Sequence, residues 1–159
     1  EQRAHLRSMG MHYHQWGITS SYDTRYNPKR SFKWAKFKTF QETVEALGHS
    51  DRVLDILKVD CEGCEWYTYK DWLSSMDIRQ LLVETHNQDN TWKYHHQINF
   101  DFFDDLLDKG YVIFSKEPNI YPIVTRKGVA IEWSMLKLVP SFSGGRQPRP
   151  MKTTTQNGG

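Results

Sequence analysis

The sequence has few cysteines, little net charge and no long apolar run. Its only two cysteines, Cys61 and Cys64, lie three positions apart. They cannot form the disulfide framework of a small secreted domain, and they leave the redox compartment open. The 21 basic and 19 acidic residues give a formal charge of +2, which argues against a nucleic-acid-binding surface. No run approaches the roughly 20 apolar residues that a membrane-spanning helix needs.

The chain is long enough to form one domain. The 159 residues are 38% hydrophobic and 14% aromatic, which suffices for a core. Residues 140–159 are Pro, Gly, Thr and polar residues without a period, so we expect a domain over residues 1–139 and a disordered tail after it. The chain begins with Glu1 and not with Met, and no basic-then-apolar leader precedes it, so a processed or truncated N-terminus is expected.

The first third of the chain predicts one strand, one loop and one helix. Alternating polarity predicts a strand over Ser8–Thr19, and the basic, aromatic segment 22–37 with its proline predicts an irregular loop. A short helix should follow. Thr39 is its expected N-cap, Glu42 the capping-box partner and Gly48 the C-terminal stop.

Strands and helices then alternate. Val53–Val59 is a nearly continuous apolar run, typical of a strand covered on both faces. A helix is expected within residues 66–76, followed by a second apolar strand over Ile78–His86. This alternation predicts an α/β fold with a parallel sheet.

In the last part of the domain, the sequence pattern predicts a helix and two antiparallel strands. The helix, residues 99–110, should place one apolar stripe on the core and end at Gly110; the stripe is Phe100, Phe103, Leu106 and Leu107. The strands are Tyr111–Lys116 and Val129–Leu138. A turn-rich connection with Pro118, Asn119, Pro122 and Gly128 joins them and favours antiparallel pairing.

Polar residues follow both of the predicted buried strands. Asp60 and Glu62 come directly after the first, and Glu84 and His86 end the second. Ligands of parallel α/β sheets bind outside the carboxyl ends of the strands, so we expect these four side chains to converge. The alternative is structural: Asp60 caps a helix, and the acids after it, Glu62 and Glu65, decorate a first turn where the helix dipole favours them.

The two cysteines also allow more than one interpretation. Cys61 and Cys64 could form half of a zinc site or a redox pair. There is no second CxxC, no histidine pair has the spacing of a Cys2His2 site, and neighbouring acids raise thiol pKa values. We therefore expect two small side chains that pack a tight strand-to-helix turn and bind no metal.

Residues 55–66, DILKVDCEGCEW, resemble the motif of the FkbM-like methyltransferases. That motif has an apolar strand, then Lys, a hydrophobe, Asp, a variable residue, Glu, Gly, a small residue and Glu. LLVETH at 81–86 resembles the family's next strand. FDFFDDLLDKGYVIFSKEPN at 100–119 and IEWSMLKL at 131–138 resemble the helix and terminal hairpin of its animal branch, the methyltransferase-like proteins typified by methyltransferase-like protein twenty-four. The resemblance covers about residues 10–138.

This resemblance implies a Rossmann-like class I methyltransferase sheet with strand order 3-2-1-4-5-7-6, mostly parallel with an antiparallel last strand. It also implies S-adenosylmethionine as cosubstrate. The family opens with a strand, a glycine-rich turn and a helix that hold this cosubstrate, and no such glycine cluster is found here. Residues 8–19 would correspond to the third strand. We therefore expect the N-terminal strands, and with them most of the cosubstrate site, to be missing.

The implied reaction is methyl transfer to an oxygen or nitrogen of a small-molecule, glycan or peptide acceptor. Asp60 is the candidate to orient the cosubstrate amine or the nucleophile, Glu84 or His86 the candidate base, and Glu62 fixes the turn. The turn after the first strand could border the adenine. The expected cosubstrate-binding residues are Gly17, Ile18, Asp60 and Cys61.

Two further hypotheses come from other classes of protein. One is a non-catalytic α/β module that binds a partner through an aromatic, basic loop, namely Phe32, Lys33, Trp34 and Phe37. The other is a metal-dependent hydrolase whose ligands are Asp60, Glu62, Glu84 and His86. The methyltransferase resemblance gives the better account of these same four residues.

The chain as given should bind S-adenosylmethionine weakly or not at all. Each missing hydrogen-bonding partner of the cosubstrate costs about 1–3 kcal/mol, so the loss of several weakens binding by orders of magnitude. Isothermal titration of the 159-residue chain, beside a chain extended upstream, measures this. Micromolar or tighter binding by the short chain would contradict the expectation.

Overall fold

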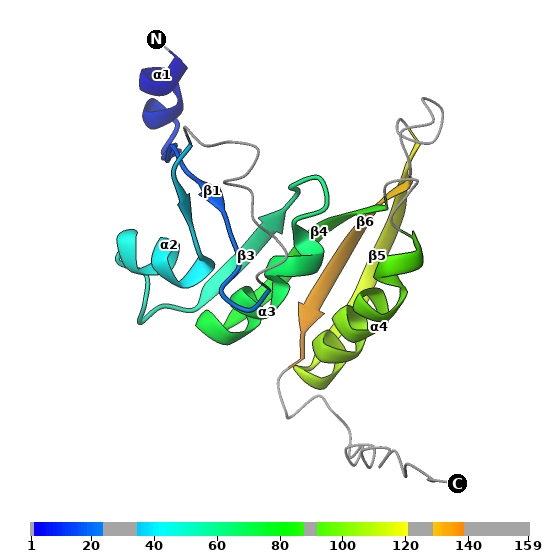
Figure 1. The fold of residues 1–159 in the computed structure, drawn as a ribbon. Coiled ribbons are helices and arrows are strands. Elements are labelled where there is room, and N and C mark those ends of the chain that lie inside the picture. The colour runs from blue at the N-terminus through cyan, green and yellow to red at the C-terminus, as the bar shows by residue number, and fades with distance from the viewer. Residues whose placement is uncertain (1, 24–34, 88–91, 121–128, 139–159) are drawn as a thin grey trace, which may run out of the picture.

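The computed structural model describes residues 2–23, 35–87, 92–120 and 129–138 (Figure 1). A four-stranded sheet has the order β3-β4-β6-β5, and a short parallel pair, β1-β2, forms a separate sheet. The short pair is β1 (Gly17–Ile18) and β2 (Phe37–Lys38). The strands of the larger sheet are β3 (Leu54–Val59), β4 (Ile78–Asn87), β5 (Tyr111–Asn119) and β6 (Val129–Lys137).

Four helices accompany these strands. They are α1 (Gln2–Ser8), α2 (Phe40–Ala46), α3 (Glu65–Ser75) and α4 (Trp92–Asp108). Among the residues that the structure describes, no helix is both long enough and apolar enough to cross a membrane.

The strand directions confirm the predicted mixed sheet. β3 and β4 pair in parallel, and β6 pairs antiparallel with both β4 and β5. β3, β4 and β5 therefore run in one direction, and β6 is the reversed strand of these four. Because Val59 pairs with Val83 at the carboxyl ends of β3 and β4, the residues that follow these two strands start at the same edge of the sheet.

The start of α2 confirms the predicted capping box. The Glu42 N–H donates to Thr39 Oγ1 at 3.1 Å, and the Thr39 N–H donates to Glu42 Oε2 at 2.7 Å. Two of the helix's first donors are thereby satisfied. Gly48, just after the helix, has a φ of 68°, a conformation that glycine adopts without steric cost.

The core lies between the sheet and helices α3 and α4, which Figure 1 shows packed against it. Phe102 of α4 meets Trp66 and Tyr69 of α3 edge-on, with ring centroids 5.4 and 5.1 Å apart. Such edge-to-face pairs add to the free energy gained by burying the rings. The other buried hydrophobic residues of this cluster are Phe40, Val44, Trp72, Ile78, Leu81, Val83, Leu106, Tyr111 and Met135.

The prediction that β3 is covered on both faces is wrong. Leu57 packs against the core, whereas its neighbour Ile56 is 54% exposed. Leu136 of β6, on the same exposed side, is also solvent-accessible. Helices α3 and α4 cover one face of the sheet, and no described element covers the side chain of Ile56.

The apolar stripe predicted for α4 is also wrong in part. Phe100 and Leu107 are exposed, while Leu106 and Phe102 are buried and Phe103 is partly buried. The segment has apolar residues at so many neighbouring positions that more than one helical stripe fits it. Packing against the α3 aromatic rings selects the stripe that contains Phe102.

The region before α2 differs most from the predictions. Instead of a strand over Ser8–Thr19, the structure has α1 up to Ser8 and only two strand residues, Gly17 and Ile18. The predicted loop 22–37 ends in β2, and its residues 24–34 lie outside the described part of the chain, as does the predicted tail at 140–159.

The buried carboxylate of Asp71 holds the segment after β1 by accepting hydrogen bonds from Ser20 and Ser21.

The Tyr111 hydroxyl offers a test of the core, because it donates to the Ile78 carbonyl oxygen at 2.6 Å. Tyr111→Phe leaves that buried carbonyl unpaired and should lower the free energy of unfolding by about 1–3 kcal/mol. Burial raises the pKa of Tyr111 to about 12, above the usual value of about 10. The unfolded chain therefore loses this proton at lower pH than the folded chain does. The difference in free energy of unfolding between the parent and Tyr111→Phe should shrink as pH rises from about 10 to about 12.

Urea unfolding of both proteins at neutral and at high pH measures the two effects. Tyr22→Phe is the matched control, because the Tyr22 side chain is 59% exposed. Equal stability of Tyr111→Phe and the parent at neutral pH would contradict the assigned role.

Candidate functional site

The four polar residues predicted to converge do lie together at the carboxyl edge of β3 and β4. The centre of the group is His86 Nε2. It is 3.8 Å from Asp60 Oδ1, 3.7 Å from Glu62 Oε2 and 3.7 Å from Glu84 Oε1. Parallel pairing of β3 and β4 produces this arrangement, because both strands end at the same edge of the sheet.

Glu65, the first residue of α3, holds this histidine. Its side chain is fully buried, and Oε1 accepts the His86 backbone N–H at 2.6 Å and lies 3.1 Å from His86 Nδ1. The other carboxylate oxygen, Oε2, accepts the Gly63 N–H at 2.9 Å. One buried carboxylate therefore joins the turn before α3 to the end of β4.

The backbone of His86 is fixed on its carbonyl side as well. Trp66 Nε1 donates to the His86 carbonyl oxygen at 2.9 Å, so two consecutive residues of α3 bind both backbone polar groups of one residue of β4. Within the described contacts, Nδ1 is turned to Glu65 and Nε2 to the carboxylates of Asp60, Glu62 and Glu84.

The role of Glu65 was not predicted from the sequence, in which it is one of the acids that suit the first turn of a helix. The available signal was its place as the last glutamate of the motif in residues 55–66, where a helix N-terminus follows a strand end. Spacing alone did not show that this side chain points inward.

The electrostatics of the group follow from its burial and charge. The hydrogen bond with Glu65 raises the pKa of His86; burial opposes this change, and the negative charges of Glu62 and Glu84 reinforce it. Burial raises the pKa of Glu84. The Asn119 amide, which donates to Glu84 Oε1 at 2.8 Å, acts in the opposite direction.

The turn between β3 and α3 has an uncommon backbone. Glu62 has a φ of 56° and Gly63 a φ of 103°. A non-glycine residue in the left-handed region is uncommon and costs free energy. This conformation places the Glu62 carboxylate beside His86 while its side chain remains 80% exposed.

The two cysteines form a disulfide, which the expectation of two small side chains packed in a tight turn did not include. Cys61 and Cys64 are bonded with their Cα atoms 5.4 Å apart. The tight turn between β3 and α3 brings the two side chains together. The packing role does hold for Cys64, which is 3% exposed.

The expected cosubstrate-binding residues lie in different elements of the fold. Asp60, which lies beside His86, and Cys61 directly follow β3, whereas Gly17 and Ile18 form β1 in the other sheet. A Cβ on Gly17 would lie 2.6 Å from the Phe37 ring, so the close packing of that ring already explains the glycine.

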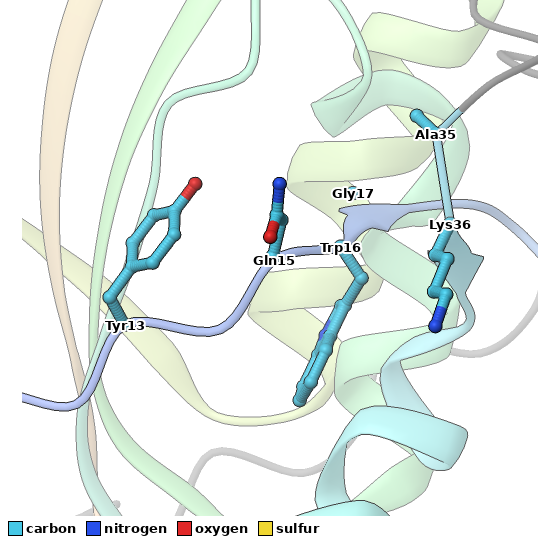
Figure 2. Close-up of a pocket in the computed structure, with 6 residues that line it drawn as sticks. All are labelled: Tyr13, Gln15, Trp16, Gly17, Ala35 and Lys36. Carbon is cyan, nitrogen blue, oxygen red and sulfur yellow. The ribbon is translucent and has the colours of Figure 1, made fainter.

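A pocket of about 500 Å³ adjoins Gly17, and Figure 2 shows the side chains around it. Trp16 gives it an aromatic wall, with the His14 ring 4.7 Å away and Lys38 Nζ 5.5 Å from the indole. Its volume is within the range of small-molecule sites. The lining residues are Tyr13, Gln15, Trp16, Gly17, Ala35 and Lys36.

Comparison with known proteins identifies the class of this chain. A family model described as a methyltransferase domain matches residues 2–135. The match spans most of the chain and includes every residue of the group around His86, so the chain belongs to the methyltransferase-domain family. No curated protein and no solved structure gives a significant match.

The disulfide is open to a direct test. With the bond intact, neither Cys61 nor Cys64 has a free thiol, so an alkylating reagent should modify neither until a reductant is added. Mass spectrometry of the intact protein before and after reduction gives the result. Alkylation of the unreduced protein at either cysteine would show that the bond is absent in solution.

Proposed function

We propose that this chain is the S-adenosylmethionine-dependent methyltransferase domain of an FkbM-type protein of the animal methyltransferase-like branch. The motif in residues 55–66 supports the FkbM type, and residues 100–119 and 131–138 support the animal branch. The strand order β3-β4-β6-β5, with β6 reversed, supports a Rossmann-like class I sheet, because it corresponds to strands 4-5-7-6 of that architecture. The observation that carries the proposal is the convergence around His86 at the carboxyl ends of β3 and β4.

The charges at this edge suit the proposed cosubstrate. Asp60, Glu62 and Glu84 each place a carboxylate oxygen 3.7–3.8 Å from His86 Nε2, and this gathering of negative charge favours a cationic ligand at the edge. Bound S-adenosylmethionine supplies an electrophilic methyl group on a positively charged sulfur. The aromatic pocket beside Gly17 would hold the adenine part.

The chain's own residues then have distinct tasks toward an oxygen or nitrogen acceptor. Asp60, 44% exposed, orients the nucleophile, and the turn at Glu62 keeps its carboxylate beside it. Glu84 is a nearly buried carboxylate that lies 3.7 Å from His86 Nε2, and it accepts the proton that the acceptor releases. His86, fixed by Glu65, holds these groups in place.

The experiment that tests the proposal maps ligand binding by NMR. S-adenosylmethionine at millimolar concentration, with a chelator present, should shift the resonances of Asp60, Cys61 and His86. Glu84→Gln should keep these shifts but lower methyl transfer to a panel of hydroxyl and amine acceptors by about 10²–10⁴-fold, the usual contribution of a general base.

Asp55→Asn is the matched control, because Asp55 lies on the same strand but forms an exposed pair with Arg79. It should change neither binding nor transfer. Two results would contradict the proposal. One is the absence of any shift, and the other is shifts confined to the contact between α3 and α4, for example around Tyr69 and Asp105.

A further inference from the structure

His86 Nε2 belongs to a mostly buried side chain and makes no hydrogen bond in the described part of the chain. The side chain is 10% exposed, and its one ring hydrogen bond, with Glu65, uses Nδ1. Nε2 instead faces three carboxylate oxygens at 3.7–3.8 Å. A mostly buried imidazole nitrogen normally has a hydrogen-bond or metal partner, and the three carboxylates lie too far from Nε2 to accept a hydrogen bond from it.

The distances between His86 Nε2 and the carboxylate oxygens indicate that its missing partner is a cation. Distances of 3.7–3.8 Å exceed the roughly 2.7–3.2 Å of a hydrogen bond. Ligand atoms that share one cation at about 2.0–2.2 Å lie about 3.3–3.6 Å apart when the geometry is tetrahedral. One ligand atom each from Asp60, Glu62 and His86 lies within 4.8 Å of the others, so small side-chain rotations suffice to close the set.

We propose that Asp60, Glu62 and His86 bind one divalent transition-metal cation, with the Glu84 carboxylate beside it. Two carboxylates and one imidazole suit Mn²⁺ or Zn²⁺ better than Mg²⁺, which favours oxygen ligands. The cation would also relieve the mutual repulsion of carboxylates gathered at one edge of the sheet.

The partner of Nδ1 supports this assignment independently of the ligand set. A metal-binding histidine usually donates its other ring N–H to a carboxylate, which fixes the tautomer and the ring orientation. Glu65 is such a partner: it is fully buried and held in place by the Gly63 N–H and the His86 N–H. With the proton on Nδ1, the lone pair of Nε2 points toward Asp60 and Glu62.

The disulfide prevents the two neighbouring cysteines from competing for the cation. Cys61, Cys64 and Glu65 form a second group of possible ligands, but the ligand form of cysteine is the thiolate. While the two sulfurs are bonded to each other, a cation at this edge is left with Asp60, Glu62 and His86.

The role of the cation rests on the proposed function. Bound beside Asp60, it would coordinate the acceptor oxygen and lower the pKa of that hydroxyl. The released proton passes to Glu84, and the acceptor oxygen forms its new bond to the methyl carbon while the C–S electron pair stays on sulfur. The metal site itself does not depend on this step.

Titration of the full chain with Mn²⁺ tests the site, without reductant and without S-adenosylmethionine. Calorimetry and the loss of the free Mn²⁺ EPR signal should both give one equivalent per chain. Asp60→Asn and His86→Gln should each weaken binding at least tenfold. Asp55→Asn and His12→Gln, which alter exposed residues of the same types, should bind as the parent does.

A second measurement covers the case in which a variant does not fold. Pulsed EPR of Mn²⁺ bound to the parent protein should show a ¹⁴N coupling from an imidazole ligand, and His12→Gln should retain it. Absence of the coupling, of Mn²⁺ binding at millimolar concentration, or of any weakening in folded Asp60→Asn and His86→Gln would overturn the proposal. S-adenosylmethionine shifts in the presence of chelator test the methyltransferase function separately, so either proposal can fail alone.

Discussion

The buried carboxylate of Glu65 is the interaction on which this edge of the molecule depends. It binds the Gly63 N–H of the turn before α3 and the N–H of His86 at the end of β4. Burying an unpaired carboxylate costs several kcal/mol, so such a group persists only when it is fully hydrogen-bonded. The three donors around Glu65 meet that condition only if the turn, the helix and the strand keep their present positions.

This constraint explains how a four-stranded sheet can keep the side chains around His86 in defined positions. β4 is paired with β3 as far as Val83 and with β6 through His86, which lies opposite Ala130, and so the backbone at His86 cannot shift easily. The Trp66 indole N–H fixes its carbonyl from the core side. Helix α3 thereby does two things: its apolar residues fill the core, and its first residue positions the histidine.

The sequence predicted the parts of the fold that depend on local pattern. The capping box of α2, the apolar runs of β3 and β4 and the reversed β6 were all predictable from neighbouring residues, and so was the meeting of Asp60 with His86 at parallel strand ends. The α4 stripe was not predictable, because several stripes fit the same residues and only the α3 rings select one.

What the sequence could not give was the direction of single side chains in the β3–α3 turn. Whether Glu65 points inward depends on the left-handed backbone at Glu62 and Gly63, which no periodicity encodes. The same turn brings Cys61 and Cys64 into bonding distance. The one-sided burial of β3 was missed for a different reason: a run of apolar residues shows that a strand can be covered, not which elements cover it.

The group around His86 combines a rigid member with adjustable ones. The imidazole is 10% exposed and fixed through its ring and its backbone, whereas the Asp60 and Glu62 side chains are 44% and 80% exposed. Exposed carboxylates can rotate toward a ligand at little cost, because water solvates them in every rotamer. A ligand that enters this edge therefore meets one nitrogen already in position and oxygens that close around it. The disulfide-bridged turn limits how far those oxygens can move away.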